Sequence, residues 1–448
     1  MTFEIRMVQV QDVVNRKVNY KLYPSNEQKL LLENMFNNHR KLYNALLEQR
    51  IYAWKGNQKS LSYADQCKQI TLLRNEIEEF EKINAQSLQE TAKRLDKAYK
   101  SFFTRVKERK TPGFPRFKSY DRFTGFGYKT HGDGWRINTS NAKKVTRKQK
   151  TRGGSVRISG VGKIQIRGMS RNGGTPKTME VLKKSDEWII SVTYQCVPER
   201  NSGEHIHTFD WGLENFLTIA NEDEEITIVE NPRFLKTASE KILKIQQELS
   251  RKKLRSNNRK KIKLRLSRIH KKVANKRLDF MHKESCKLVE NSKRIITEKL
   301  TIKNITKAPK VKIDEVTGEY LPNGAARKAG LNKSILDTSP SQFLQMVRVK
   351  AEEAGYELDE LETKKLKPSQ RCAQCSRVEK KDLSQRIHNC SCGFKISRDA
   401  NSALVMLRYA IGSLKIESQV EKKSRGPSLC VKTPQGALKH ETPSIITQ

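Results

Sequence analysis

The chain has 448 residues, enough for two or three domains with a large core. Its 89 lysines and arginines outnumber its 49 aspartates and glutamates, so the formal net charge is +40. Such an excess argues against an ordinary enzyme of small substrates and predicts a polyanionic partner, first nucleic acid and second an anionic membrane surface. No apolar stretch approaches the roughly 18–20 residues of a membrane span, and the N-terminal segment lacks a signal peptide's apolar core. We expect a soluble, cytoplasmic protein that binds nucleic acid and no membrane.

The N-terminal part is predicted to be one strand followed by helices. Residues 18–24, VNYKLYP, alternate apolar and polar side chains as a half-exposed strand does. Ser25 has Gln28 three residues further on, which is the spacing of a capping box at the start of a helix. Apolar residues recur near helical spacing from there to about residue 110, so this segment is predicted to be helical.

A β-rich, basic segment follows, because two prolines and a glycine in TPGFPRFKSY, at 111–120, interrupt the helical pattern. Short strands and turns are predicted over 117–198, of which SVRISGVGKIQIRG, at 155–168, is a clear example and EWIISVTYQCVP, at 187–198, is a good strand. Seven aromatic side chains lie near its start, and they either stack on unpaired bases or fill a β-barrel core. They are Phe114, Phe117, Tyr120, Phe123, Phe126, Tyr128 and Trp135.

From residue 205 onward, predicted strands and helices are mixed. The strands are predicted over 205–213, 215–221, 225–231, 294–302 and 356–362. The helices are predicted over about 234–289, from Ser339-Pro340, and from Ser397 to about Ala410. The polar, turn-rich segment 412–448 is predicted to be disordered in the absence of a partner.

Two close pairs of cysteines lie just before the last predicted helix: Cys372, Cys375, Cys390 and Cys392. Two thiolate pairs that converge on one centre are what tetrahedral Zn²⁺ requires, whereas a disulfide pairing is disfavoured in a reducing compartment. Four protein ligands leave no position for water, so this zinc is expected to be structural and to fold a small ribbon. Basic residues of the ribbon are predicted to contact a phosphate backbone: Arg371, Lys380 and Lys381.

Three acids lie at the ends of predicted elements, each beside apolar sequence: Asp210, Glu298 and Asp399. If they meet in space, their charges repel one another unless cations are bound. Two Mg²⁺ ions roughly 3.5–4 Å apart, bridged by carboxylates, are a standard arrangement for cutting a phosphodiester. Taken alone, Glu298 could equally be an ordinary surface charge. Asp399 alone could be an acid that stabilises the first turn of a helix.

A strongly basic stretch between residues 251 and 277 contains fourteen lysines or arginines and no acid. A solvated helix face is the ordinary interpretation of such a run, but so many like charges favour phosphate binding. The predicted nucleic-acid contacts in this stretch are Lys252, Lys253, Arg255, Arg259, Lys260, Lys261 and Lys263.

Several of these motifs together resemble one protein family. FDWGLENFLTIA, ITEKLTIKNI, the four-cysteine ribbon and SRDANSALVML are similar, in this order, to the three split RuvC motifs and the zinc ribbon of TnpB. TnpB is the RNA-guided nuclease of bacterial insertion sequences, related to the type V CRISPR effectors. The N-terminal segments YKLYPSNEQKLLLENMFNNHRKLYNALL and LDKAYKSFFTRVKERKTPGFPRFKSY also resemble this family, so the resemblance covers roughly residues 18–411.

The resemblance implies that Asp210, Glu298 and Asp399 are the magnesium-binding catalytic acids of an RNase H-like domain. Asn401 occupies the family's Asp-x-Asn position and is expected to support the third acid. Trp211 stands where the family usually has an aliphatic residue, which leaves the packing beside Asp210 open.

The implied architecture is an α/β RNase H-like (RuvC) nuclease domain with an inserted four-cysteine zinc ribbon. It is preceded by a β-barrel wedge domain that holds an inserted helical recognition domain. The expected boundaries are 1–25 and 115–200 for the wedge, 26–114 for the recognition domain, 201–365 and 397–411 for the nuclease, 366–396 for the target-binding ribbon and 412–448 for the disordered tail.

The implied function is that of a two-metal, Mg²⁺-dependent DNA endonuclease encoded by a transposable element. It is expected to bind a guide RNA and to cut complementary double-stranded DNA beside a short flanking motif, as a monomer near the prokaryotic nucleoid. Two alternatives remain: an RNA-guided repressor that binds DNA without cutting, and a guide-free, RuvC-like nuclease that recognises DNA structure.

Overall fold

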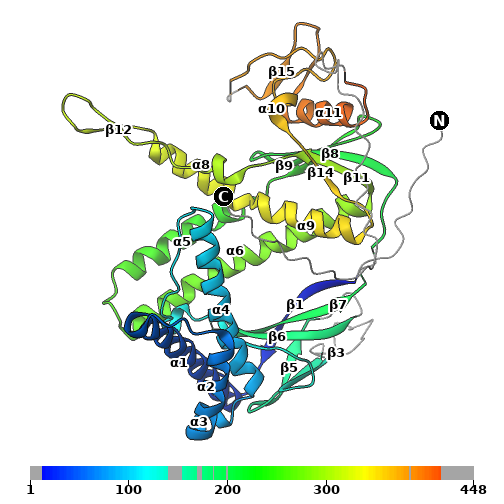
Figure 1. The fold of residues 1–448 in the computed structure, drawn as a ribbon. Helices are drawn as coiled ribbons and strands as arrows, with labels where there is room; N and C mark the ends of the chain where they lie inside the picture. The colour runs from blue at the N-terminus through cyan, green and yellow to red at the C-terminus, as the bar shows by residue number, and fades with distance from the viewer. Residues whose placement is uncertain are drawn as a thin grey trace, which may run out of the picture.

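The computed structural model describes residues 13–139, 154–168, 174–184, 186–197, 200–382 and 385–414. Nearly all of the tail predicted to be disordered lies outside these ranges. In Figure 1 the N-terminal helices lie beside a first sheet, and a second sheet lies above them with the cysteine ribbon at the top. No helix in the ranges given above combines the length and apolar character needed to cross a membrane.

The first sheet has seven antiparallel strands in the order β2-β6-β7-β1-β5-β4-β3. Their bounds are β1 Val14–Tyr23, β2 Gly125–Tyr128, β3 Trp135–Thr139, β4 Gly154–Ile158, β5 Gly162–Arg167, β6 Thr175–Lys184 and β7 Glu187–Cys196. The predicted strand near the N-terminus is confirmed, and it lies in the middle of the sheet because it pairs with both β7 and β5. Among the described strands β2 and β3 remain edges, so closure into a barrel stays a prediction.

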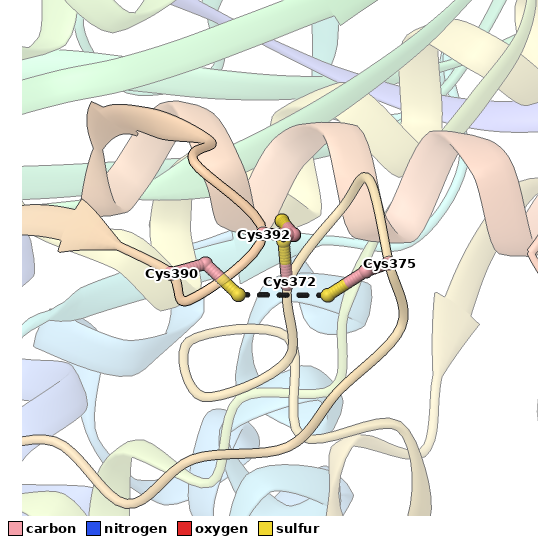
Figure 2. Close-up of side chains that lie close together, drawn as sticks. All are labelled: Cys372, Cys375, Cys390 and Cys392. Carbon is pink, nitrogen blue, oxygen red and sulfur yellow. Dashed lines mark hydrogen bonds between the residues drawn. The ribbon is translucent and has the colours of Figure 1, made fainter.

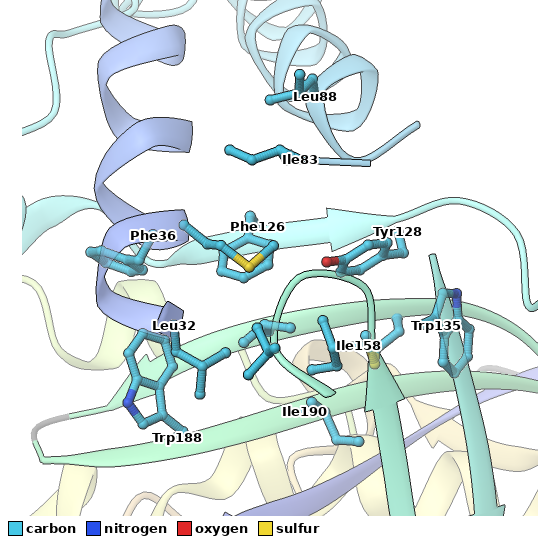
Figure 3. Close-up of a cluster of buried hydrophobic side chains, with 14 of the residues drawn as sticks. Leu32, Phe36, Ile83, Leu88, Phe126, Tyr128, Trp135, Ile158, Trp188 and Ile190 are labelled. Atoms are coloured by element: carbon cyan, nitrogen blue, oxygen red, sulfur yellow. The ribbon is translucent and has the colours of Figure 1, made fainter. Parts of the chain in front are cut away.

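Helices α1 (Asn26–Asn57), α2 (Tyr63–Glu76), α3 (Glu78–Glu81) and α4 (Ala85–Lys107) follow β1, and a short 3₁₀ turn spans Tyr120–Arg122. The predicted capping box is confirmed: the Ser25 hydroxyl accepts a hydrogen bond from the Gln28 N–H, and the Gln28 side chain accepts one from the Ser25 N–H. Side chains of α1 and α4 share one core with the sheet (Figure 3), so the helical segment is not a separately packed body.

The seven aromatic residues near residue 120 divide between the two roles considered for them. Phe126, Tyr128 and Trp135 lie in the shared core (Figure 3). Phe123 is also buried. The other three, Phe114, Phe117 and Tyr120, are exposed. The core interpretation is therefore confirmed for four of the seven.

The second sheet has five strands in the order β10-β9-β8-β11-β14. Their bounds are β8 His205–Trp211, β9 Asn215–Asn221, β10 Ile226–Glu230, β11 Ser292–Glu298 and β14 Leu358–Leu361. β8, β11 and β14 are parallel, whereas β9 and β10 form an antiparallel extension from β8. All five strands predicted in this part of the chain are confirmed.

Helices cover both faces of the second sheet. Their bounds are α5 Phe234–Ser250, α6 Asn257–Glu290, α7 Ile302–Ile305, α8 Ala325–Thr338, α9 Pro340–Glu353, α10 Thr363–Leu366 and α11 Arg398–Ala410. Phe209 and Ile295 pack with Phe343 and Val347 of α9, while Ala220 packs with apolar side chains of α11. Two small hairpins complete the fold: β12 (Lys312–Ile313) with β13 (Tyr320–Leu321), and β15 (Ile387–Asn389) with β16 (Lys395–Ser397).

Candidate active site

The three predicted acids come from neighbouring elements of the second sheet. Asp210 lies near the end of β8, and Glu298 is the last residue of β11. These strands are parallel, and the register places Phe209 opposite Thr297, so both carboxylates reach the same edge of the sheet. Asp399 lies in the first turn of α11, whose cap is the Ser397 hydroxyl, and α11 packs across β8.

Asp210 lies close enough to both other acids for their charges to act on it. Burial raises the pKa of Asp210 well above its ordinary value, and the charges of Glu298 and Asp399 raise it further. Burial also raises the pKa of Glu298. Each of the three residues keeps partial exposure to solvent. A partly exposed site in which Asp210 and Glu298 resist ionisation is suited to divalent cations, because bound positive charge stabilises the carboxylates.

Gly212 gives Asp399 room to approach β8. A Cβ at this position would lie 2.8 Å from the backbone oxygen of Asn215 and 3.4 Å from Oδ2 of Asp399. A side chain here would therefore press on the turn after β8 and on the third acid. The neighbouring Trp211 packs against the Phe209–Phe343 core cluster, so the large ring at this position is accommodated by apolar contacts.

The sequence prediction missed two residues of α11 that act on Asp210. The buried Ser402 forms a side-chain hydrogen bond with Asp210, and the positive charge of Arg398 also lowers the pKa of that carboxyl. Ser402 lies three residues after Asp399, a spacing that puts both side chains on one face of a helix. The sequence could have indicated the role of Ser402 through this spacing. Arg398 also donates to the backbone oxygens of Asp382 and Gln385 in the ribbon, at 3.2 and 3.4 Å.

The four cysteines converge on one point, as Figure 2 shows. All four Sγ atoms lie within 4.8 Å of one another. The Sγ atoms of Cys372 and Cys392 are 3.7 Å apart, and those of Cys375 and Cys390 are 3.5 Å apart. A tetrahedral site with Zn–S bonds of about 2.3 Å has sulfur–sulfur edges of about 3.8 Å, whereas a disulfide needs about 2.05 Å. The four residues therefore fit zinc.

The thiols of the ribbon differ in acidity. Burial raises the pKa of Cys372 to about 12. Burial also acts to raise the pKa of Cys390. The Cys390 sulfur, however, accepts hydrogen bonds from the Cys392 N–H and from the other cysteine side chains, and these outweigh burial and lower the pKa of Cys390 to about 6. Zinc binds thiolates, so loading this cluster must release protons from the thiols that are still protonated.

The structure corrects one predicted nucleic-acid contact of the ribbon. Arg371 is only 8% exposed, and its guanidinium donates to the backbone oxygens of Leu366 and Ser376, each at 2.9 Å. Its donors serve the ribbon's own fold rather than an external phosphate.

The other two predicted contacts of the ribbon are lysines. Lys381 contacts Nδ1 of the buried His388, which is not part of the cysteine cluster. Lys380 is exposed.

The basic stretch forms the turn between α5 and α6 and the first half of α6. Acids from distant segments compensate part of its charge: Lys263 pairs with Asp121, Arg265 with Glu248, Arg268 with Asp186, Lys271 with Glu187 and Arg277 with Asp337. The absence of acids within the stretch therefore does not leave all of its charges uncompensated.

The predicted contacts lie in the less compensated part of this stretch. Within the described ranges, no carboxylate lies within 4.0 Å of Lys252, Lys253, Arg255, Lys260 or Lys261. Arg259 donates to the backbone oxygens of Leu249 and Lys252 and so closes the turn. We define the basic tip as Lys252, Lys253, Arg255, Lys260 and Lys261, all of which are exposed.

Three family models match different parts of the chain. One for the OrfB protein of IS605, described as "Probable transposase", matches residues 190–308 and includes Asp210 and Glu298. One described as "Cas12f1-like, TNB domain" matches residues 341–406 and includes the ribbon and Asp399. A third, described as "Helix-turn-helix domain" of IS605 OrfB, matches residues 13–59, where the structure has β1 and α1.

Whole proteins are similar over most of the chain. A "Putative RNA-guided DNA endonuclease" of Streptomyces pristinaespiralis is 27% identical over 95% of this chain and 97% of its own length. The "Putative RNA-guided DNA endonuclease InsQ" of Escherichia coli K12 is also 27% identical, over 71% of this chain and 73% of its own length.

The fold is similar to that of a Cas12f1 protein solved by cryo-electron microscopy in a Cas12f1–sgRNA–target DNA complex. The TM-score is 0.52 at 11% sequence identity, over 88% of this chain and 99% of that one. At this identity the similarity concerns the fold alone. Together with the family models and the two relatives, it confirms the resemblance drawn from the motifs: the chain is similar to the TnpB-type proteins of IS605-type insertion sequences.

Proposed function

We propose that this protein is an RNA-guided DNA endonuclease of a transposable element. It would cut double-stranded DNA complementary to a bound guide RNA, beside a short flanking motif, with Mg²⁺ as the catalytic ion. The observation that carries the proposal is that the charges of Glu298 and Asp399 both act on Asp210, at the edge where the parallel strands β8 and β11 end. The names of the two relatives, which match most of the chain, support it.

The proposed chemistry is hydrolysis of a phosphodiester bond. Two bound Mg²⁺ ions would supply the activation of the attacking water and the stabilisation of the leaving oxygen. The chain supplies the carboxylates that hold these ions, with Asp210 facing both other acids. The Ser402 hydroxyl and the positive charge of Arg398 both favour the ionised form of the Asp210 carboxyl. Such charge also favours a phosphate that approaches the acids.

The remaining surfaces would hold the nucleic acids. We assign the basic tip to the phosphate backbone of the guide RNA or of its duplex with the target. We assign the ribbon to target contact, with Lys380 as one of its exposed cations, and its zinc to a structural role. The wedge and recognition assignments of residues 1–200 are part of the same proposal, as is a monomer working at the prokaryotic nucleoid.

The direct test starts from the purified full-length protein. We expect RNA of defined sequence to co-purify with it. We also expect a plasmid that carries the matching target to be cut in Mg²⁺, and a new guide segment to redirect the cut. RNA-dependent binding without cutting would identify a silent repressor instead. Cutting that is unchanged after RNA removal would identify a guide-free nuclease.

Neutralising the basic tip should weaken nucleic-acid binding and its dependence on salt. The double change Lys260→Ala with Lys261→Ala removes two exposed charges at the start of α6. Each lost phosphate contact should reduce the slope of log affinity against log salt by roughly 0.9 on duplex and roughly 0.7 on single strands. Filter binding between low and moderate salt measures the slope directly.

A matched control uses the other end of the same helix. Lys283 and Lys287 are equally exposed, but they pair with Asp279 and Glu284 on α6. Changing both to alanine removes the same formal charge and should leave the slope unchanged. Equal effects from the two pairs would mean that general net charge, rather than the basic tip, drives binding.

A further inference from the structure

One buried amide joins the zinc ribbon to the helix that carries Asp399. Asn401, in the first turn of α11, is fully buried. Its Nδ2 donates to the backbone oxygens of Arg371, at 2.6 Å, and Pro368, at 3.3 Å. Its Oδ1 accepts from the Ala373 N–H at 3.0 Å. Residues 371 and 373 flank Cys372, so the side chain of Asn401 holds the backbone on both sides of a proposed zinc ligand.

These contacts do not match the role expected of Asn401, which was to support Asp399. Its two amide hydrogens and its oxygen are engaged by the ribbon backbone, so the predicted direct support of Asp399 is replaced by a contact on the ribbon side. Aspartate has nearly the same shape, but it lacks both donors and would place a charge against two carbonyl oxygens. Alanine would leave the two carbonyls and the Ala373 N–H without this partner in a buried position.

Further contacts make the base of the ribbon and α11 one packed unit. Arg408 of α11 donates to the Ala373 oxygen at 2.7 Å, and its guanidinium also pairs with Glu224 in the turn after β9. Ala373 and Leu366 pack in the core cluster formed by apolar side chains of α11. A movement of the Cys372 segment therefore acts on the first turn of α11, where Asp399 lies two residues before Asn401.

We propose that Asn401 is a positioning residue that couples zinc at the four cysteines to divalent-cation binding at the three acids. Zinc fixes the turn around Cys372, and Asn401 transmits that order to the first turn of α11. Asp399 is thereby held beside Gly212, facing Asp210. Only one part of this proposal rests on the proposed function, namely that the acids are used to cut DNA. Linkage makes it reciprocal, so each metal site should strengthen the other.

The test measures metal binding on the full-length protein without nucleic acid. Mn²⁺ is titrated into the zinc-loaded protein and followed by electron paramagnetic resonance, with Asp399→Asn marking the signal that belongs to the acids. We expect Asn401→Ala to weaken this Mn²⁺ binding at least roughly fivefold, the lower end of typical coupling between sites. Zinc transfer to a chromogenic chelator should also be faster, and Asn401→Asp should behave like Asn401→Ala.

The control is Asn389, an exposed asparagine in β15 of the same ribbon. Asn389→Ala should leave both measurements at wild-type values. Faster zinc release with wild-type Mn²⁺ affinity in Asn401→Ala would overturn the coupling and leave Asn401 as a ribbon anchor only. These readouts do not require cleavage, so a failure of the proposed nuclease activity remains distinguishable from a failure of the coupling.

If Asn401→Ala does not fold, the wild-type protein still decides the question. Mn²⁺ affinity is compared before and after zinc is removed by a zinc-selective chelator that is then separated from the protein. The proposal expects weaker Mn²⁺ binding after zinc removal and recovery when zinc is restored. An Mn²⁺ affinity that does not depend on zinc would overturn it.

Discussion

Replacing Asp399 with asparagine should abolish cutting of a guide-matched DNA while its RNA-dependent binding persists. The substitution keeps the shape of the side chain but removes a negative charge from the group that faces Asp210. Affinity for Mg²⁺ and activation of the attacking water should fall together. We expect a loss of roughly 10⁴-fold or more in the cleavage rate, as for other members of cooperating catalytic sets. Binding should survive because it would rest on base pairing and on basic surfaces elsewhere.

The measurement pairs a gel shift with a cleavage assay on the same preparations. Asp223→Asn makes the same chemical change at an exposed position in the turn after β9, and it should cut normally. Combining Asp399→Asn with Asp210→Ala should be little worse than either alone, because the acids serve one step. Strong cutting by Asp399→Asn would remove this residue from the catalytic set. Joint loss of binding and cutting would indicate a misfolded junction between the ribbon and α11.

Thermal unfolding of related variants gives a second readout of the same site, independent of cleavage. Without divalent cations, burial and the two neighbouring carboxylates raise the pKa of Asp210. At a pH between the unfolded and the folded pKa of Asp210, the folded protein therefore holds a proton that the unfolded chain has released. The free energy of unfolding therefore falls as pH rises through that window. Asp210→Asn should raise the Tm at a pH above the folded pKa of Asp210 and reduce the pH dependence of the Tm, whereas added Mg²⁺ should stabilise only the wild-type cluster.

Local signals in the sequence were sufficient for the elements that carry the acids. Ser25 and Ser397 each precede a helical pattern, and each caps its helix in the structure. The strands that end near Asp210 and Glu298 carry β-branched residues close to these acids, Ile206 and Thr208 in β8 and Ile295, Ile296 and Thr297 in β11, and such residues favour a strand. Because both strands are parallel neighbours in one sheet, their last residues meet at the same edge. The convergence of the acids was therefore predictable once the strands were recognised.

Residue roles that depend on contacts between distant segments could not be predicted from local signals in the sequence. Arg371 and Lys380 look alike in the sequence, yet only the first folds back onto backbone oxygens. The sequence shows no acid near Arg268 and Lys271, but Asp186 and Glu187, at the turn into β7 of the first sheet, pair with them. No periodicity or spacing reports which carbonyls surround a side chain. The contacts of Asn401 with the ribbon were hidden for the same reason.

Loss of the zinc ligands should unfold the ribbon and disable cutting without removing any catalytic group. The purified protein should contain about one zinc per chain. Cys372 is fully buried at the base of the ribbon, whereas Cys375 is exposed. Cys372→Ser should therefore do more damage than Cys375→Ser, because it also disturbs the backbone that Asn401 and Arg408 hold. The matched control is Cys67→Ser, which changes a cysteine outside the cluster.

Zinc content, limited proteolysis and cleavage are measured on the same samples. In the Cys372→Ser protein we expect little zinc, rapid proteolysis within residues 366–396 and little cutting, while the first sheet keeps its protection because its core is separate. Thiolates must lose their protons to bind, so the wild-type protein should release zinc as pH falls, and the same proteolytic sites should open. A fully active, zinc-free protein with a protected ribbon would contradict the assignment. It would mean that the small core at the base of the ribbon, around Ala373 and Leu366, holds the segment without metal.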